Sequence, residues 1–200
     1  MIHERPSWCC RPVQIKNLMD IVPQLRTLLY KIKPDFGNLK NGQIMYIPVE
    51  RKLIDHDCPL YSKYIESLNL LDRWEFSLIS VIGPRDTDLD MDKLFNKIHV
   101  DTTNWNYRCY GLNIPIINCE NTYTVWYEGT IDETEIKTDK NRLRSAKNLV
   151  PGSRYVEIHR HESSVPAWIN VSIPHMPLNY HNKPRAVISA RFTPEIHEYF

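Results

Sequence analysis

Two imidazoles, a carboxylate and a guanidinium form the set of side chains in this sequence that could do chemistry. His99 and Asp101 lie in the segment Ile-His-Val-Asp, His175 follows 76 residues after His99, and Arg185 lies ten residues further on. Two imidazoles and one carboxylate are the facial triad that binds Fe(II) and leaves positions open for substrates and O₂. A guanidinium can anchor an anionic co-substrate through paired hydrogen bonds. The four residues therefore predict an enzyme with one Fe(II) ion.

A β-strand is the element that would position the first two ligands. Successive side chains of a strand point to opposite faces, so His99 and Asp101 would point the same way. The third ligand must come from a neighbouring strand, and His175 fits because it ends an apolar segment. His159 and His161 also share a strand face and are the alternatives, but their charged neighbours favour a solvated face or the rim of the site.

The candidate anchor begins the apolar run Arg-Ala-Val-Ile-Ser-Ala-Arg-Phe, which is typical of a strand. Alternation places Arg185, Ser189 and Arg191 on one face, so Ser189 could share the contact of Arg185 with an anion. Arg191 and Lys183 are the other candidates for the anchoring cation.

Strand-like segments recur from residue 74 onward. They span 74–82, 97–101, 108–117, 122–128, 153–161, 165–173 and 185–192. Strands at this spacing with polar turns predict a sandwich or barrel, and a jelly roll fits their number best. We therefore expect a mainly β (α+β) fold.

The N-terminal part has a different character. Apolar residues at helical spacing predict a helix over residues 22–33, and Ser62 could cap a second helix that ends at Leu71. Residues 43–48 read as a short extended piece. We expect a single domain over 1–200, with a helical part at 1–73 and a jelly-roll core at 74–192.

A polar insertion interrupts the expected core at residues 129–152. It is rich in Asp, Glu, Lys, Arg and Asn. One interpretation is a solvated surface insertion with a helical turn at 142–148, and the other is a mobile lid over the mouth of a site. The composition favours the first.

The overall composition limits the classes of partner. Lys plus Arg is 25 and Asp plus Glu is 24, for a net charge of +1. The absence of a basic stripe argues against nucleic acid as a partner, and the apolar runs are too short to span a membrane. The start of the sequence lacks the apolar segment of a secretory signal, so we expect a cytoplasmic protein. Its five cysteines include no Cys-x-x-Cys pair, which predicts reduced thiols.

The ordered set His99, Asp101, His175 and Arg185 resembles the pattern of the Fe(II)/2-oxoglutarate-dependent dioxygenases, over roughly residues 74–192. The resemblance implies a double-stranded β-helix, a cupin-like form of jelly roll, with the first three residues as the catalytic iron ligands. It implies that Arg185 binds the distal carboxylate of 2-oxoglutarate. It also implies a hydroxylase that consumes O₂ and 2-oxoglutarate and releases succinate and CO₂.

A closer likeness is to the aspartyl/asparaginyl β-hydroxylase branch, which carries an arginine nine residues after the first metal histidine in a strand of the type Arg-x-x-x-Leu-x-x-Pro. Arg108, Leu112 and Pro115 match that pattern here. By this resemblance Arg108 would contact the metal-proximal carboxylate of 2-oxoglutarate. Some members lack the metal carboxylate, whereas Asp101 is present, so the ligand set resembles the commoner three-residue type. The substrate stays open between a peptidyl side chain and a small amino-acid-like molecule.

Three other readings remain. The first is a jelly-roll binding or structural module without catalysis. The second is a metal-dependent cupin enzyme of another class, such as an isomerase or a thiol dioxygenase. These enzymes typically use three histidines, and the presence of Asp101 together with Arg185 argues against them. The third is a virion or assembly sandwich without a metal, and it predicts that His99, Asp101 and His175 do not meet in space. The oligomeric state cannot be read from the sequence.

Overall fold

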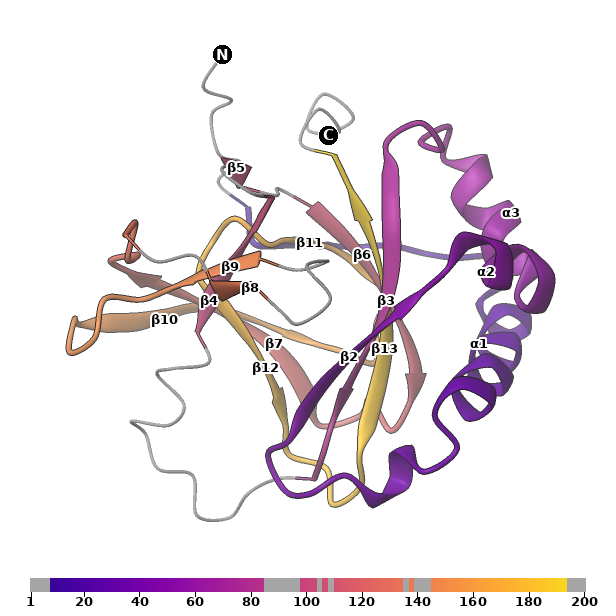
Figure 1. Cartoon of the computed structure of the whole chain (residues 1–200), viewed down its shortest axis with the longest axis horizontal. Helices are drawn as coiled ribbons and strands as arrows, with labels where there is room; N and C mark the ends of the chain where they lie inside the picture. The colour runs from indigo at the N-terminus through magenta and orange to yellow at the C-terminus, as the bar shows by residue number, and fades with distance from the viewer. Residues whose placement is uncertain are drawn as a thin grey trace.

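Two β-sheets face each other in the computed structural model, which describes residues 8–84, 98–103, 106–107, 110–134, 137–138 and 145–193. The major sheet has the order β1-β11-β6-β13-β3-β2, and the minor sheet has the order β10-β7-β12-β4-β9-β8, with β5 paired to β4 (Figure 1). The major-sheet strands are β1 (Cys10–Pro12), β2 (Ile44–Val49), β3 (Trp74–Ile82), β6 (Tyr110–Ile117), β11 (Ala167–Asn170) and β13 (Arg185–Phe192). The minor-sheet strands are β4 (His99–Thr103), β5 (Asn106–Tyr107), β7 (Thr122–Gly129), β8 (Lys137–Thr138), β9 (Ser145–Asn148), β10 (Tyr155–Glu162) and β12 (His175–Asn179).

The path of the chain between the sheets identifies the jelly roll. Strands β3, β4, β6 and β7 alternate between the major and the minor sheet, and the later strands β10, β11, β12 and β13 alternate in the opposite order. In space β13 lies between β3 and β6, and β12 lies between β7 and β4. The second half of the chain is thus inserted into the first. This is a double-stranded β-helix, as the sequence predicted.

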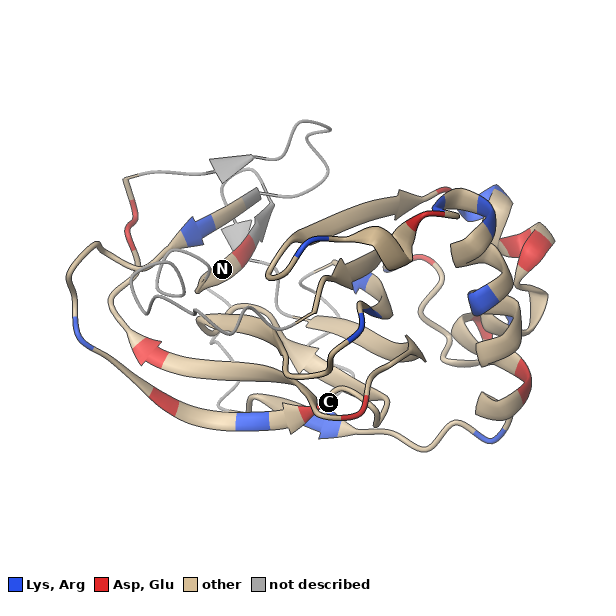
Figure 2. Cartoon of the chain, turned by 90° about the horizontal axis from the view of Figure 1, so that it is seen from below, with Lys and Arg blue, Asp and Glu red and all other residues tan. Residues whose placement is uncertain are grey.

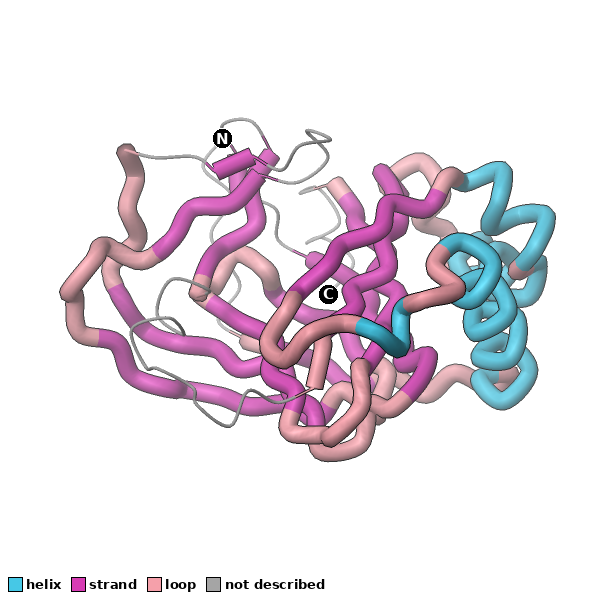
Figure 3. The backbone as a smooth tube through the Cα atoms, turned by 60° about the horizontal axis from the view of Figure 1, so that its bottom comes forward, coloured by secondary structure: helices cyan, strands magenta, loops and turns pink. Residues whose placement is uncertain are grey.

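Helices cover the outer face of the major sheet (Figure 3). They are α1 (Leu18–Ile32), α2 (Arg51–Asp57) and α3 (Pro59–Ser67), with a short 3₁₀ turn at Phe36–Asn38 between α1 and β2. On β13, Ala186 and Ile188 belong to the apolar core shared with the helices, whereas Arg185 and Val187 line a pocket between the sheets. The alternation of strand side chains thereby separates an apolar outer layer from a polar interior.

The second predicted helix is displaced. Helix α3 begins at Pro59 and ends at Ser67, directly after α2, which the sequence analysis did not predict. Proline suits the first helical position because its N–H would lack a partner there in any case. Ser62 is therefore inside the helix, and its hydroxyl donates to Asp55 Oδ1 at 2.5 Å instead of capping an N-terminus.

Two further predictions about local structure were wrong. The sequence analysis predicted no strand between residues 173 and 185, but His175–Asn179 form strand β12. β12 pairs with β7 along its length and with β4 only at His175. One side of β12 is therefore not paired to β4 at Pro177, and a proline is tolerated there because no N–H has to be donated. The helical turn expected at 142–148 is replaced at 145–148 by strand β9, because pairing with β4 satisfies its backbone groups. Residues 142–144 lie outside the described residues.

Further expectations concern the domain boundaries, the cysteines and membrane spans. The domain boundaries stay predictions, although β1 and β2 from the N-terminal part extend the major sheet at its two edges. Cys9, Cys10, Cys58 and Cys119 are free thiols, and Cys109 lies outside the described residues. No helix in the described part of the chain is long and apolar enough to cross a membrane. Figure 2 shows acidic and basic residues interspersed along the helices.

Candidate metal centre

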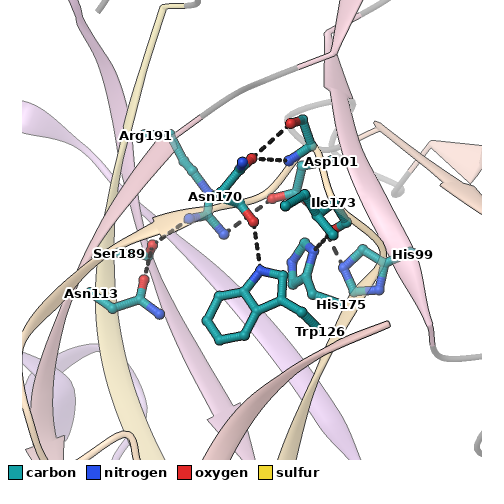
Figure 4. A network of polar contacts seen from close by, with 10 residues as sticks. His99, Asp101, Asn113, Trp126, Asn170, Ile173, His175, Ser189 and Arg191 are labelled. Atoms are coloured by element: carbon teal, nitrogen blue, oxygen red, sulfur yellow. Dashed lines mark hydrogen bonds and ion pairs between the residues drawn. The ribbon is translucent and has the colours of Figure 1, made fainter. Parts of the chain in front are cut away.

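The three predicted ligands meet between the two sheets (Figure 4). β4 supplies His99 and Asp101, β12 supplies His175, and the two histidines are directly opposite each other in the antiparallel ladder. Their ligand atoms all lie within 4.8 Å of one another, and His99 Nε2 is 3.5 Å from Asp101 Oδ1. Atoms bound to one metal at about 2.0–2.2 Å can be no more than about 4.4 Å apart, so small side-chain rotations would let one ion contact all three.

Burial and hydrogen bonding prepare His175 as a ligand. Its Nδ1 lies 3.0 Å from the carbonyl oxygen of Ile173, and we assign the proton to Nδ1, which leaves the lone pair of Nε2 free. Desolvation, followed by the nearby His99, lowers the pKa of His175 to about 3. The imidazole is therefore neutral at neutral pH, which is the form that binds metals.

The carboxylate of Asp101 has two differently placed oxygens. Oδ1 is the atom near His99, whereas Oδ2 lies 3.1 Å from Arg191 Nη2. Arg191 also donates from Nη1 to Ser189 Oγ at 2.7 Å, and Ser189 donates to Asn113 Oδ1 at 2.5 Å. Asp101 and Arg191 are only 2 % and 6 % exposed, so each neutralises the other in a buried setting.

Arg185 has the opposite situation. It is 2 % exposed, its Nε has no hydrogen-bond partner, and no carboxylate among the described residues forms an ion pair with it. Burial lowers the pKa of its guanidinium from the ordinary value. A buried cation without a partner is costly, which indicates that an anion from outside completes this part of the pocket.

One pocket is lined by this arginine and by the two histidines of the triad. The volume that a water molecule can enter is about 30 Å³, and the lining contains His99, His175 and Arg185. Tyr46 and Ser80 contribute polar side chains to the lining. An anion bound to Arg185 would therefore share one space with an ion bound to the histidines.

The other predicted site residues are placed as follows. Ser189 lines the pocket, but its hydroxyl lies between Asn113 and Arg191. Arg108 lies outside the described residues, so its expected contact with 2-oxoglutarate stays a prediction. His159 contacts Cys10 Sγ at 3.2 Å, and His161 contacts the carbonyl of Val165 at 2.9 Å, so neither belongs to the triad. Lys183 is exposed.

The sequence analysis missed the contact between Arg191 and Asp101. Strand alternation had placed Arg191 on the inner face, which was the available signal. Its partner lies on the other sheet, 90 residues earlier, and strand periodicity carries no information about the distance between sheets.

Comparisons with known proteins find similar solved structures at low identity. The epimerase SnoN, in complex with Fe³⁺, alpha ketoglutarate and nogalamycin RO, is 9 % identical, with 92 % of this chain and 77 % of that chain covered and a TM-score of 0.49. A Pseudomonas putida prolyl-4-hydroxylase is 10 % identical, with 94 % and 92 % covered and a TM-score of 0.37. An oxalate decarboxylase from Bacillus subtilis is 6 % identical, and the alignment covers 78 % of this chain but only 26 % of that chain, with a TM-score of 0.32.

No family model matches the sequence, and no curated protein matches it. Because the structural likenesses have TM-scores below 0.5, they carry no argument about activity. The fold is established by the strand order, and the function must be argued from the residues of the pocket.

Proposed function

We propose that this chain is an Fe(II)- and 2-oxoglutarate-dependent dioxygenase, a hydroxylase that acts on a peptidyl side chain or a small amino-acid-like molecule. One observation carries the proposal. The two histidines of a buried His-Asp-His triad line the same pocket as the buried Arg185, which has no carboxylate partner among the described residues. The triad supplies the donor set that suits Fe(II), and the arginine supplies the charge that a dicarboxylate co-substrate needs.

The donor atoms fit an iron ion. His99 Nε2, Asp101 Oδ1 and His175 Nε2 would hold it. His99 Nε2 lies 3.5 Å from Asp101 Oδ1, Nδ1 of His175 is bonded to the carbonyl of Ile173, and the other oxygen of Asp101 faces Arg191. Three protein ligands leave positions open for the keto acid and O₂. When bound, Fe(II) with 2-oxoglutarate and O₂ would supply the oxidation that hydroxylates a substrate and releases succinate and CO₂.

The protein's own contribution is binding and exclusion of water. Arg185 would bind the distal carboxylate, and Tyr46 and Ser80 line the same pocket. His175 stays uncharged, so it does not repel a cation. Because the ligands are 2–7 % exposed, the reacting groups would be held in a mostly dry interior, where electrostatic contacts are stronger than in water.

The alternatives fit the pocket less well. A sandwich without a metal predicted that the three side chains stay apart, but their ligand atoms lie within 4.8 Å. The three-histidine cupin enzymes do not account for the buried Asp101. A binding module with an intact iron site differs from the proposed enzyme only in turnover, so turnover is the quantity to measure.

The test is succinate formation from 2-oxoglutarate by Fe(II)-loaded protein that was purified without oxygen and then exposed to air. We expect slow succinate formation even without the primary substrate, and none from Asp101→Ala. Arg185→Gln should raise the KM for 2-oxoglutarate, whereas Lys183→Gln, a matched change at an exposed cation two residues away, should behave as the native protein. Bound iron with no succinate from the native protein would contradict the proposal and favour a binding module.

A further inference from the structure

A glycine makes room for the arginine that contacts Asp101. Gly111 on β6 is directly opposite Arg191 on β13. A Cβ atom at position 111 would lie 1.9 Å from Arg191 Nη1, closer than real Cβ contacts come, and 3.0 Å from its Cζ. Any larger residue at 111 would therefore push the guanidinium out of its place.

A short chain of hydrogen bonds from the same two strands holds the guanidinium. Ser189 lies two residues before Arg191 on β13 and accepts a hydrogen bond from Nη1 at 2.7 Å. Asn113 lies two residues after Gly111 on β6 and accepts a hydrogen bond from Ser189 at 2.5 Å. The major sheet thus fixes one side of the guanidinium, while Nη2 reaches Asp101 on the minor sheet (Figure 4).

We propose that Gly111, Ser189 and Asn113 form a seat for Arg191, and that Arg191 is a positioning residue for the metal site. By holding Oδ2 of Asp101, it leaves Oδ1 as the oxygen offered to the metal. This inference rests on the proposed function, because it assigns a role within the same site. It explains why a buried arginine, which could otherwise anchor an anion, is committed to a metal ligand.

A purely structural role would look different. If Arg191 only neutralised the charge of Asp101, its exact placement would matter little to the metal, and moving it would change the stability alone. If it positions the carboxylate, moving it changes the metal affinity and the geometry around the ion. Gly111→Ala separates the two roles, because it moves the guanidinium without removing any charge or polar group.

The experiment is titration of the native protein and Gly111→Ala with Co(II), recording the dissociation constant and the visible absorption spectrum. We expect Gly111→Ala to weaken Co(II) binding about 10- to 100-fold, the usual effect of losing a partner of a metal ligand, and to change the spectrum. Gly37→Ala is the matched control, because a Cβ at 37 meets nothing within 4 Å, and it should bind Co(II) as the native protein does.

A double-mutant cycle ties the effect to the guanidinium. In Arg191→Gln the shorter side chain ends before the space over Gly111, so adding Gly111→Ala should cost little further affinity. Ser189→Ala removes one hydroxyl and adds no atoms, and it should shift the affinity and the spectrum in the same direction. It replaces Gly111→Ala as the test variant if Gly111→Ala fails to fold.

The outcomes separate the two proposals. Native Co(II) affinity and an unchanged spectrum in folded Gly111→Ala, or in Ser189→Ala where Gly111→Ala does not fold, would overturn the role of Arg191 and leave the proposed function standing. Additive losses in the cycle would overturn it too. Failure of the native protein to bind Co(II) at all would overturn the proposed function, and the positioning role with it.

Discussion

The two arginines of β13 occupy the same face of one strand and are equally inaccessible to water, yet their surroundings differ. Arg191 has a carboxylate and a hydroxyl within hydrogen-bond distance. Arg185, six residues earlier, has no such carboxylate among the described residues. An interior cation with an internal partner belongs to the scaffold, whereas one without a partner is suited to a charged ligand. In the proposed enzyme, one strand would thus support both the metal ligand and the co-substrate.

Removal of Asp101 should have the largest effect on stability, because it breaks the buried ion pair between Asp101 and Arg191. Asp101→Ala deletes a proposed iron ligand and leaves Arg191 as a second buried cation, which should cost about 3–5 kcal/mol of unfolding free energy. Denaturant unfolding of metal-free protein measures this cost. A loss below about 1 kcal/mol would mean that the pair is not buried as described. Asp101→Asn, which keeps the shape, separates charge from packing.

Binding of 2-oxoglutarate should supply the carboxylate partner that Arg185 lacks among the described residues. In metal-free protein, 2-oxoglutarate at 100 times its dissociation constant should stabilise the fold by about 2.7 kcal/mol, because it binds only the native state. 2-Oxobutyrate lacks the distal carboxylate and should stabilise less at the same concentration. Thermal unfolding with each acid is the measurement, and equal stabilisation by both would argue that Arg185 is not the anchor.

Neutral replacement of each arginine should give opposite results for stability. Arg185→Gln should raise the KM for 2-oxoglutarate about 30-fold, which corresponds to a loss of about 2 kcal/mol of binding. It should leave the unfolding free energy unchanged or higher, since it removes a buried charge that no described carboxylate neutralises. Arg191→Gln should instead lower that free energy. Enzyme kinetics and denaturant unfolding, measured on both variants, test this contrast. Similar destabilisation by both variants would contradict the different roles of the two arginines.

Acid should lower the unfolding free energy through protonation of His175. Near neutral pH this effect is smaller than those of the substitutions above. The pKa of His175 is about 3 in the folded protein, below the value near 6.5 of an unperturbed histidine, so unfolding takes up a proton below pH 6.5. The stabilisation is complete above about pH 6.5 and is lost as the pH falls toward 3, at about 1.4 kcal/mol per pH unit. His175→Gln should reduce this slope in metal-free protein. An unchanged slope would show that the imidazole is not held neutral.

The sequence predicted the features that depend on local periodicity. His99 and Asp101 share a face because they are two residues apart on a strand, and the run from Arg185 to Phe192 is a strand with the expected bounds. The number and spacing of strands indicated the jelly roll. These features follow from side-chain alternation, which any continuous stretch of sequence carries.

Features that depend on pairing between distant segments were not predictable in the same way. The strand that begins at His175 was hidden by Pro177, which looks like a turn until its single paired neighbour is known. Strand β9 was hidden by its polar composition, because its partner β4 determines its conformation. The different surroundings of Arg185 and Arg191 could not be predicted either, since they depend on which side chains of the opposite sheet lie nearby.

The insertion of β12 and β13 between earlier strands has a consequence for how the protein is made. A chain emerging from the ribosome would carry His99 and Asp101 long before the strands that close either sheet. Folding would have to wait for residues 175–192, because the missing strands lie in the middle of the sheets and not at their edges. Such non-local pairing slows folding and prolongs the exposure of unpaired strands. Strands β12 and β13 would therefore complete the jelly roll and the candidate metal site in the same event.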